Sequence, residues 1–340
     1  MIVMGNVEVD AMYAAAFRDW LAKAGELTPA QRQQAIAGLR QERRSGPDPW
    51  AAVLDVSRTC PHGHHPVCRP WGQAQGLPRW RCAACGKTFN ALTGTPLARR
   101  RHRERWGEDA QALIDGETVR AAARRGGVHQ NTSCRWRHRF LALPAEVKPS
   151  RLHGIVAADE TSFLESHQGE RHLSRPPRQR GGSATKRGLS DEQIPVLVVR
   201  DRSASTTAAV LPKANTAAVT AVLGPIVDPD AVRCSDSAAI YRSFAETAHI
   251  AHTAVNLSAG IRVIDHAFHL QNVNAYHGRL KGWMARCHGV ATHYLPNYLG
   301  WRRFLERFGS SLAPPLVLDL APAEGTPKAC PRNSSGVRMC

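Results

Sequence analysis

The sequence of 340 residues contains no run of about 20 apolar residues, the length that a membrane-spanning helix needs. It also begins without the basic stretch and long apolar core of a secretion signal, because Glu8 and Asp10 interrupt that region. We therefore expect a cytoplasmic protein with no membrane partner.

Acidic residues are scarce. The chain has 28 Asp and Glu against 45 Lys and Arg, which gives a formal net charge of +17. Such an excess favours a polyanionic partner, and nucleic acid is the common one. The alternative at this point is a ribosomal protein, or another protein that is simply basic.

A second complete CxxC pair is missing. Cys82-Ala-Ala-Cys85 is typical of a zinc knuckle, but a zinc ribbon needs another pair roughly 15–25 residues away, and only Cys60 stands there. The nine cysteines of a cytosolic chain favour metal binding over disulfides. We expect a structural Zn²⁺ on Cys60, Cys82, Cys85 and Cys68, with the fourth ligand left open among Cys68, His62, His64 and His65.

The patterning predicts an α+β multidomain chain. Small N-terminal helices, one of them capped by Thr28, end at the helix-breaking Gly46-Pro47-Asp48-Pro49. The expected parts are N-terminal helices over 1–49, a zinc-ribbon-like segment over 50–100, a helix-turn-helix over 101–148, an α/β catalytic domain over 150–309 and a disordered tail over 310–340.

Residues 117–141 have the outline of a helix-turn-helix. A helix over 117–125 is followed by Gly126-Gly127 and a second helix over 129–141, in which Trp136 and Phe140 are the expected core anchors. Six arginines and no acid lie between Arg120 and Arg139, which favours contact with DNA phosphates over a solvated basic helix pair. The residues expected to face DNA are Gln130, Asn131, Arg135, Arg137 and Arg139.

From residue 153 the periodicity changes to alternating strands and helices. The order is β-β-β-α-β-α-β-α, closed by one more helix. Strands are expected over 155–158, 194–199, 206–211, 231–234 and 252–256, and helices over 216–227, 237–248, 270–286 and 294–308.

Asp159 and Asp236 each follow one of these strands. Carboxylates that are distant in sequence but converge on a sheet suit Mg²⁺ or Mn²⁺, which take oxygen ligands and leave room for substrate phosphates. Asn274 and Lys281 are seven residues apart, about two helical turns, and so share a helix face. A lone Asp after a strand is otherwise most often a turn residue, and Asp265 is a rival to Asn274 as third ligand.

Over about residues 50–308 the chain resembles the ISXO-like insertion-sequence transposases of the DDE superfamily. The motifs that carry the resemblance are WRCAACGKTFNALTGTPLA, NTSCRWRHRFL, ADETSFLESHQGERHL, RPPRQRGGSATKRGLS, CSDSAAIY and FHLQNVNAYHGRLKGWMARCHGVATHYLPNYLGWRR. The resemblance implies a ribonuclease-H-like catalytic domain with Asp159 and Asp236 as the first two metal ligands. It further implies Glu or Asn as the third ligand, here Asn274, and a lysine two turns later, here Lys281.

The implied activity is metal-dependent hydrolysis at the ends of a mobile element, followed by attack of the exposed 3′-hydroxyls on target DNA. Two ends imply a homo-oligomer of at least two protomers on double-stranded DNA. Two alternatives stay open: a catalytically decayed DNA-binding repressor of transposition, and a nuclease without strand transfer. The acid-free run 171–187 is expected to line the DNA channel through Arg178, Arg180, Lys186 and Arg187.

Overall fold

The protein is represented by a computed structural model. It describes residues 23, 26–34, 59–63, 65–145, 147–149, 151–170, 172–173, 175–178, 182–186, 190–236, 238–256 and 259–318. The chain divides into two units, Met1–Ala51 and Ala52–Cys340. In the first, residues 29–34 are helical, and the Thr28 hydroxyl accepts a hydrogen bond from the Gln31 backbone N–H at 3.3 Å. The Gln31 side chain accepts one from the Thr28 N–H in return, so the cap predicted at Thr28 is present.

The second unit begins with a small antiparallel sheet in the order β1 (Cys68–Ala74), β2 (Leu77–Cys82) and β3 (Thr88–Phe89). Only Gln75 and Gly76 join β1 to β2, and both have a positive φ, 54° and 71°. Two successive residues with positive φ are what a two-residue hairpin turn requires, because that turn matches the twist of the flanking strands.

Three helices follow: α4 (Trp106–Ile114), α5 (Val119–Gly126) and α6 (Gln130–Ala142). The Thr118 hydroxyl caps α5, and Gly127, with a φ of 61°, ends it. Trp136 and Phe140 are buried, as predicted, and the Phe140 ring meets Trp106 of α4 edge-on. The three helices therefore share one apolar core.

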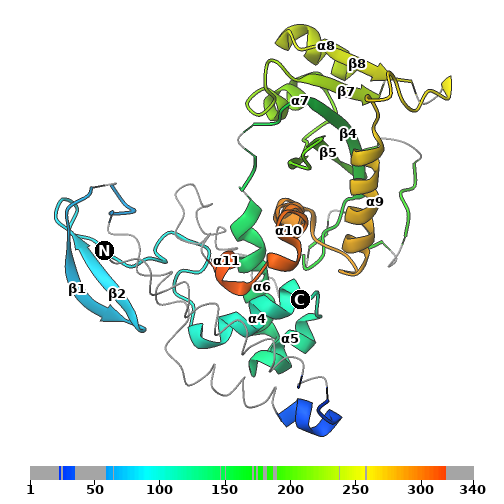
Figure 1. Ribbon diagram of the computed structural model, residues 1–340. Helices are drawn as coiled ribbons and strands as arrows, with labels where there is room; N and C mark the ends of the chain where they lie inside the picture. Colours follow the sequence, from blue (N-terminus) through cyan, green and yellow to red (C-terminus); the bar gives the residue numbers. More distant parts are fainter. Residues whose placement is uncertain are drawn as a thin grey trace. The chain divides into compact units, whose positions relative to one another are not determined.

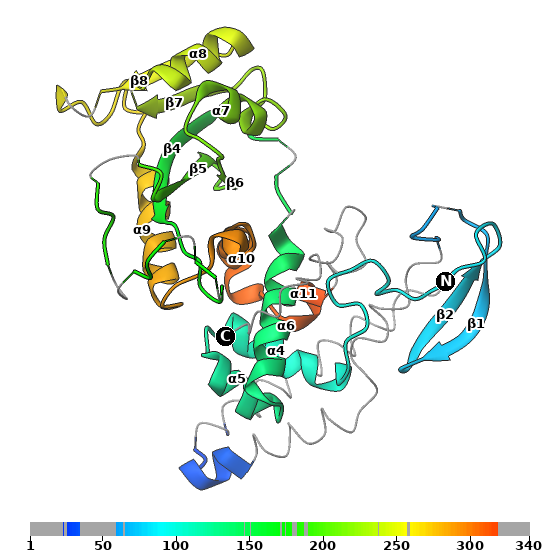
Figure 2. The same cartoon turned by 180° about the vertical axis from the view of Figure 1, so that it is seen from behind.

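A five-stranded mixed sheet forms the centre of the remaining part (Figures 1 and 2), in the order β6-β5-β4-β7-β8. The middle strand β4 is parallel to β7 and antiparallel to β5. The outer strands are β8, parallel to β7, and β6, antiparallel to β5. The strands are β4 (Ile155–Leu164), β5 (Gln193–Asp201), β6 (Thr206–Val210), β7 (Val232–Asp236) and β8 (His252–Val255).

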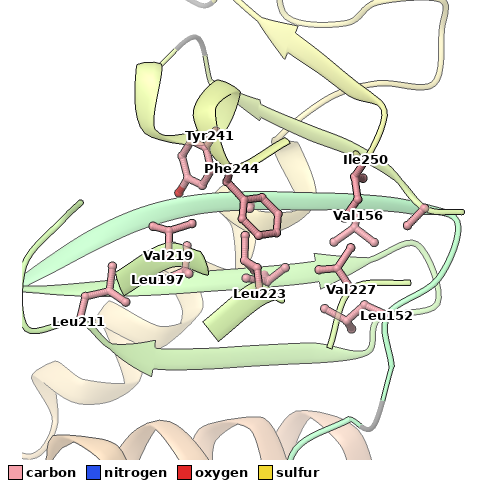
Figure 3. Close-up of a cluster of buried hydrophobic side chains, with 13 residues drawn as sticks. Leu152, Val156, Leu197, Leu211, Val219, Leu223, Val227, Tyr241, Phe244 and Ile250 are labelled. Carbon is pink, nitrogen blue, oxygen red and sulfur yellow. The ribbon is translucent and has the colours of Figure 1, made fainter. Parts of the chain in front are cut away.

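Helices cover both faces of this sheet. On one face, α7 (Thr216–Leu223) and α8 (Ala239–Ala248) bury Tyr241 and Phe244 against Val156 and Leu197 (Figure 3). On the other, α9 (Gln271–Ala285) and α10 (Leu295–Phe308) pack on Ala157, Val198 and Cys234. Adjacent residues of β4 therefore point to opposite faces, Val156 and Ala158 to α7 and α8, and Ala157 to α9.

The order of strands and helices is as predicted, with shifted ends. Asp159 lies inside β4 rather than after it, because residues 160–164 continue to pair with β5. Asp236 is likewise the last residue of β7. Among the described residues, no helix combines the length and apolarity needed to cross a membrane.

Part of the segment 310–340, which we expected to be a disordered tail, is helical. Residues 314–318 form the helix α11 (Pro314–Leu318), which packs against α4 and buries Val317. The segment LAPPLVL was assigned to the tail because of its prolines. Its apolar residues Leu312 and Val317 are buried, and this burial stabilises the short helix. Residues 319–340 lie outside the described part of the chain.

Candidate active site

Asp159 and Asp236 occupy matching positions on neighbouring parallel strands. Ala158 of β4 is in register with Ser235 of β7, and the two aspartates are the next residues on each strand. Side chains alternate along a strand, so Asp159 points to the same face as Ala157, and Asp236 to the same face as Cys234. Both aspartates therefore belong to the face that α9 covers. Two carboxylates that lie 77 positions apart in sequence are thus neighbours in space.

Ionising the Asp159 carboxyl group is costly in the folded protein. Burial, and after it the negative charge of Asp236, raise the pKa of Asp159 from 3.8 to about 7. The Glu160 N–H, which donates to Asp159 Oδ1 at 2.9 Å, and the charge of Lys281 act in the opposite direction. Two partly buried carboxylates that lie side by side offer the oxygen ligands that a hard cation prefers.

Helix α9 brings His277 to Asp159. His277 Nδ1 lies 3.7 Å from Asp159 Oδ2, the His277 side chain is buried, and its Nε2 has no hydrogen-bond partner among the described residues. Burial, followed by the charge of Lys281, lowers the pKa of His277 to about 4, so its ring is neutral near pH 7. The sequence interpretation missed His277, although its spacing of three from Asn274 and four from Lys281 puts it on the same helix face.

Asn274 and Lys281 are both exposed on α9. Lys281 is near enough for its charge to act on Asp159 and His277, whereas Asn274 lies one turn before His277, at the fourth residue of the helix. The structure therefore brings Asp159, Asp236 and Lys281 together and leaves Asn274 at the solvent edge of the same face. The rival ligand Asp265 is exposed, in a turn with a φ of 49°.

Glu160 is a further acidic group that the sequence interpretation missed. It follows Asp159 and points to the other face of β4, towards Tyr241. Burial, and less strongly the charge of Asp236, raise the pKa of Glu160, and its Oε1 has no hydrogen-bond partner among the described residues. The sequence feature that could have identified it is the pair of adjacent acidic residues in ADET, residues 158–161.

The cysteine cluster contains three of the four predicted zinc ligands. The ligand sulfurs of Cys60, Cys82 and Cys85 lie within 4.8 Å of one another, and Cys60 Sγ is 3.6 Å from Cys85 Sγ. Tetrahedral thiolates at 2.3 Å from zinc lie about 3.8 Å apart, so this spacing fits the ion. The Cys85 N–H, donating to the Cys82 sulfur, helps to lower the pKa of Cys82 to about 7.

Cys68 lies opposite Cys82 in the β1–β2 ladder. Its pKa is raised by burial and by the negative charges of Cys82 and Cys60, so it lies within their electrostatic reach. Of the histidine alternatives, His65 uses Nδ1 to accept the Val67 N–H at 3.2 Å, and His62 is exposed. His64 lies outside the described residues.

The predicted DNA-facing residues of α6 separate into two groups. Gln130, Asn131 and Arg135 are exposed and Arg139 is half-buried. Arg137 instead points inward, where Nη2 donates to the Glu117 carbonyl at 2.6 Å and burial lowers its pKa. This position differs from the exposed one predicted for it.

The acid-free run is only partly described. Arg178 is mostly buried and bonds to the Glu165 carbonyl at 2.7 Å and to Glu192 at 3.2 Å, so its charge is paired. Lys186 is exposed. Arg180 and Arg187 lie outside the described residues.

Known proteins resemble the chain in two ways. The family model of the ISXO2-like transposase domain matches residues 151–304. Among solved structures, a pre-cleavage Mos1 transpososome is 16% identical over 64% of this chain and 78% of that chain, with a TM-score of 0.17. A Mos1 strand transfer complex is 18% identical over 61% of this chain and 78% of that chain, with a TM-score of 0.19.

Structural likenesses with such low TM-scores carry no argument about fold or function. No curated protein sequence matches the chain. The family match stands on its own and spans Asp159, Asp236, Asn274 and Lys281. Residues 151–304, somewhat less than half of the chain, therefore match the ISXO2-like transposase domain.

Proposed function

We propose that the protein cleaves DNA at the ends of its mobile element and joins the freed 3′-hydroxyls to target DNA, with Mg²⁺ or Mn²⁺. The observation that carries the proposal is the pair Asp159 and Asp236, side by side on β4 and β7 beneath α9, within an ISXO2-like transposase domain. Burial and the negative charge of Asp236 raise the pKa of Asp159, and a bound cation would favour its ionised form.

Asp159 and Asp236 hold the metal in this proposal, with the amide oxygen of Asn274 as the third protein ligand. Two divalent cations, when bound, stabilise charge on the attacking and leaving oxygens of a phosphodiester. Lys281 supplies a positive charge next to Asp159 on the exposed side of α9, where it can hold a DNA phosphate. An amide ligand brings one negative charge fewer than a carboxylate, which suits a site where Asp159 and Asp236 already repel each other.

Double-stranded DNA is the proposed partner, with at least two protomers joining the two ends of the element. The exposed residues Gln130, Asn131 and Arg135, with Arg139, lie on α6 and fit a recognition helix. Arg178 and Lys186, together with Arg180 and Arg187, remain the proposed lining of the DNA channel. Arg137 is better suited to holding α6 against Glu117 than to binding DNA.

A structural Zn²⁺ on Cys60, Cys82 and Cys85, with Cys68 as fourth ligand, is the proposed support of the ribbon. Three of these thiol groups lie within 4.8 Å of one another, and beside the cysteines the hydrophobic cluster around them contains Phe89 and the partly buried Trp80. A sheet this small has too little apolar core to be stable alone, so the ion would contribute directly to folding.

Cleavage of a plasmid that carries the gene with its flanking DNA tests the function. We expect nicks at the element's ends with Mg²⁺ or Mn²⁺, and joined products after longer incubation. Asp236→Asn should lower the cleavage rate by about 10³-fold, since lost metal stabilisation is worth several kcal/mol. Equal DNA binding without cleavage by either protein would instead indicate a repressor, and cleavage without joined products a nuclease.

His277→Ala should lower the cleavage rate by about 10–100-fold and raise the Mn²⁺ concentration needed for half-maximal rate, because groups that orient a ligand contribute to metal affinity. The reason is the 3.7 Å approach of its ring to Asp159. Gln271→Ala, exposed at the start of the same helix, is the control and should change neither quantity. An unchanged Mn²⁺ dependence in His277→Ala would show that the ring does not position Asp159.

A further inference from the structure

An exposed tryptophan stands on the β1–β2 hairpin. Trp71 is 49% exposed, and the Arg81 guanidinium lies 4.6 Å from the centre of its ring. Trp71 falls where the ladder is irregular, between Pro70 and Gln73, next to Gly72 with a φ of 72°. The backbone here is bent by a bulge, a device that re-aims a side chain.

The hairpin has two different sides. Cys82 and Phe89 are buried in its small core, with Trp80 packed against them. Arg81 alternates with these residues and so projects from the opposite side, where Arg69 is its partner across the ladder. Arg69, Trp71 and Arg81 are all exposed. We call these three residues the ribbon face.

The charge of this segment has one sign only. From Cys60 to Arg103 the sequence has no Asp or Glu, while its basic residues are Arg69, Arg79, Arg81, Lys87, Arg99, Arg100, Arg101 and Arg103. No carboxylate of the segment itself can neutralise the two guanidiniums of the ribbon face. Such a surface suits a polyanion, and an aromatic ring between arginines suits one that also carries stacking bases.

We propose that the ribbon face is a DNA-binding surface, in which Arg69 and Arg81 contact phosphates and the Trp71 ring lies against a base or its sugar. The proposal rests on the proposed function for the identity of the polyanion as DNA. It adds a second contact, separate from α6 and from the channel residues of 171–187. A surface of this kind increases affinity on any DNA sequence, because phosphates and aromatic stacking are read without regard to base identity.

Fluorescence anisotropy with the full chain and a labelled random-sequence duplex that carries a single-stranded end, whose bases are free to stack, tests the proposal. Between about 50 and 200 mM salt, Arg81→Gln should reduce the slope of log K against log salt by about one, the effect of one lost phosphate contact. Trp71→Ala should weaken binding about 10-fold with little change in slope, and Trp71→Phe should restore most of the loss. Lys213→Gln, an exposed lysine between β6 and α7, is the matched control and should leave affinity unchanged.

Zinc content and Tm distinguish an unfolded ribbon from a lost DNA contact. Both should match the wild-type values in each variant. Wild-type affinity and slope in both Arg81→Gln and Trp71→Ala would overturn the proposal, and so would altered self-association with unchanged DNA affinity. Cleavage that still depends on Asp236 would in that case leave the proposed function standing. A wild-type protein that neither binds nor cuts DNA would overturn both.

Discussion

Asp159→Asn should abolish DNA cleavage and, in the absence of metal, make the protein more stable. The buried carboxylate of Asp159 lies beside that of Asp236, and its pKa is raised to about 7. In the unfolded chain the pKa of the same group is near 3.8. Ionising the group therefore lowers the stability of the folded state. Asparagine keeps an Oδ1 to accept the Glu160 N–H and removes the charge.

The size and pH range of this effect follow from the pKa. The carboxyl group binds protons more tightly in the folded protein, so wild-type stability falls as pH rises from about 4 to about 7 and is level above. A shift of this size corresponds to an upper limit of about 4 kcal/mol, and repulsion shared with Asp236 makes about 2 kcal/mol a reasonable expectation.

Urea unfolding without added Mg²⁺ or Mn²⁺ at pH 5 and pH 8 is the measurement, paired with cleavage in Mn²⁺. Asp159→Asn should gain stability over wild type mainly at the higher pH and should lose the stabilisation that Mn²⁺ gives to wild type. Asp191→Asn, an exposed aspartate, is the control and should change neither. Lower stability of Asp159→Asn at pH 8 would mean that the carboxylate is satisfied by the protein itself and that no cation is needed there.

The sequence was sufficient for the positions of Asp159 and Asp236, because apolar runs place strands and the strands carry these residues. It placed the end of β4 too early, since residues 160–164 are mixed in polarity and their pairing with β5 decides their conformation. The spacing of His277 from Asn274 and Lys281 places it on their helix face, but the sequence does not show that this face lies against Asp159. Its role depends on which face of α9 meets the sheet, and that is decided by the packing of Val273, Tyr276 and Leu280.

Arg137 belongs both to a run of arginines, which predicts exposure, and to the buried face of α6, which determines its position. The run of arginines on α6 favoured an exposed, DNA-facing side chain. Arg137 lies four residues after the buried Ser133 and three before the buried Phe140, which is the spacing of an inward face. The helix therefore presents Arg135 outward and uses Arg137 internally.

A buried arginine joins the helical part to the five-stranded sheet. Arg303 of α10 is 6% exposed and donates to the Ala208 carbonyl of β6 at 2.9 Å. Its other terminal nitrogen donates to the carbonyls of Ala145 and Val147, at the end of the helical part, at 3.0 and 3.3 Å. One turn earlier, a Cβ on Gly300 would lie 2.5 Å from the Ala145 Cα, so the backbones meet directly there.

Arg303→Met should therefore cost about 3–5 kcal/mol of unfolding free energy, because it leaves buried carbonyls without their donor. Gly300→Ala should destabilise the same junction by steric overlap, by about 1–3 kcal/mol. Arg307→Met, exposed one turn further along α10, is the matched control and should change stability by less than about 0.5 kcal/mol.

Limited proteolysis tests whether Arg303 stabilises this junction in particular. If Arg303 holds them together, Arg303→Met should speed tryptic cleavage after the exposed Arg151, between the helices and the sheet, more than it speeds cleavage elsewhere. Uniformly faster digestion would mean that Arg303 stabilises the whole fold instead. A wild-type digestion pattern with unchanged unfolding free energy would mean that the three carbonyls find other partners, and that the backbone contact at Gly300 carries the junction alone.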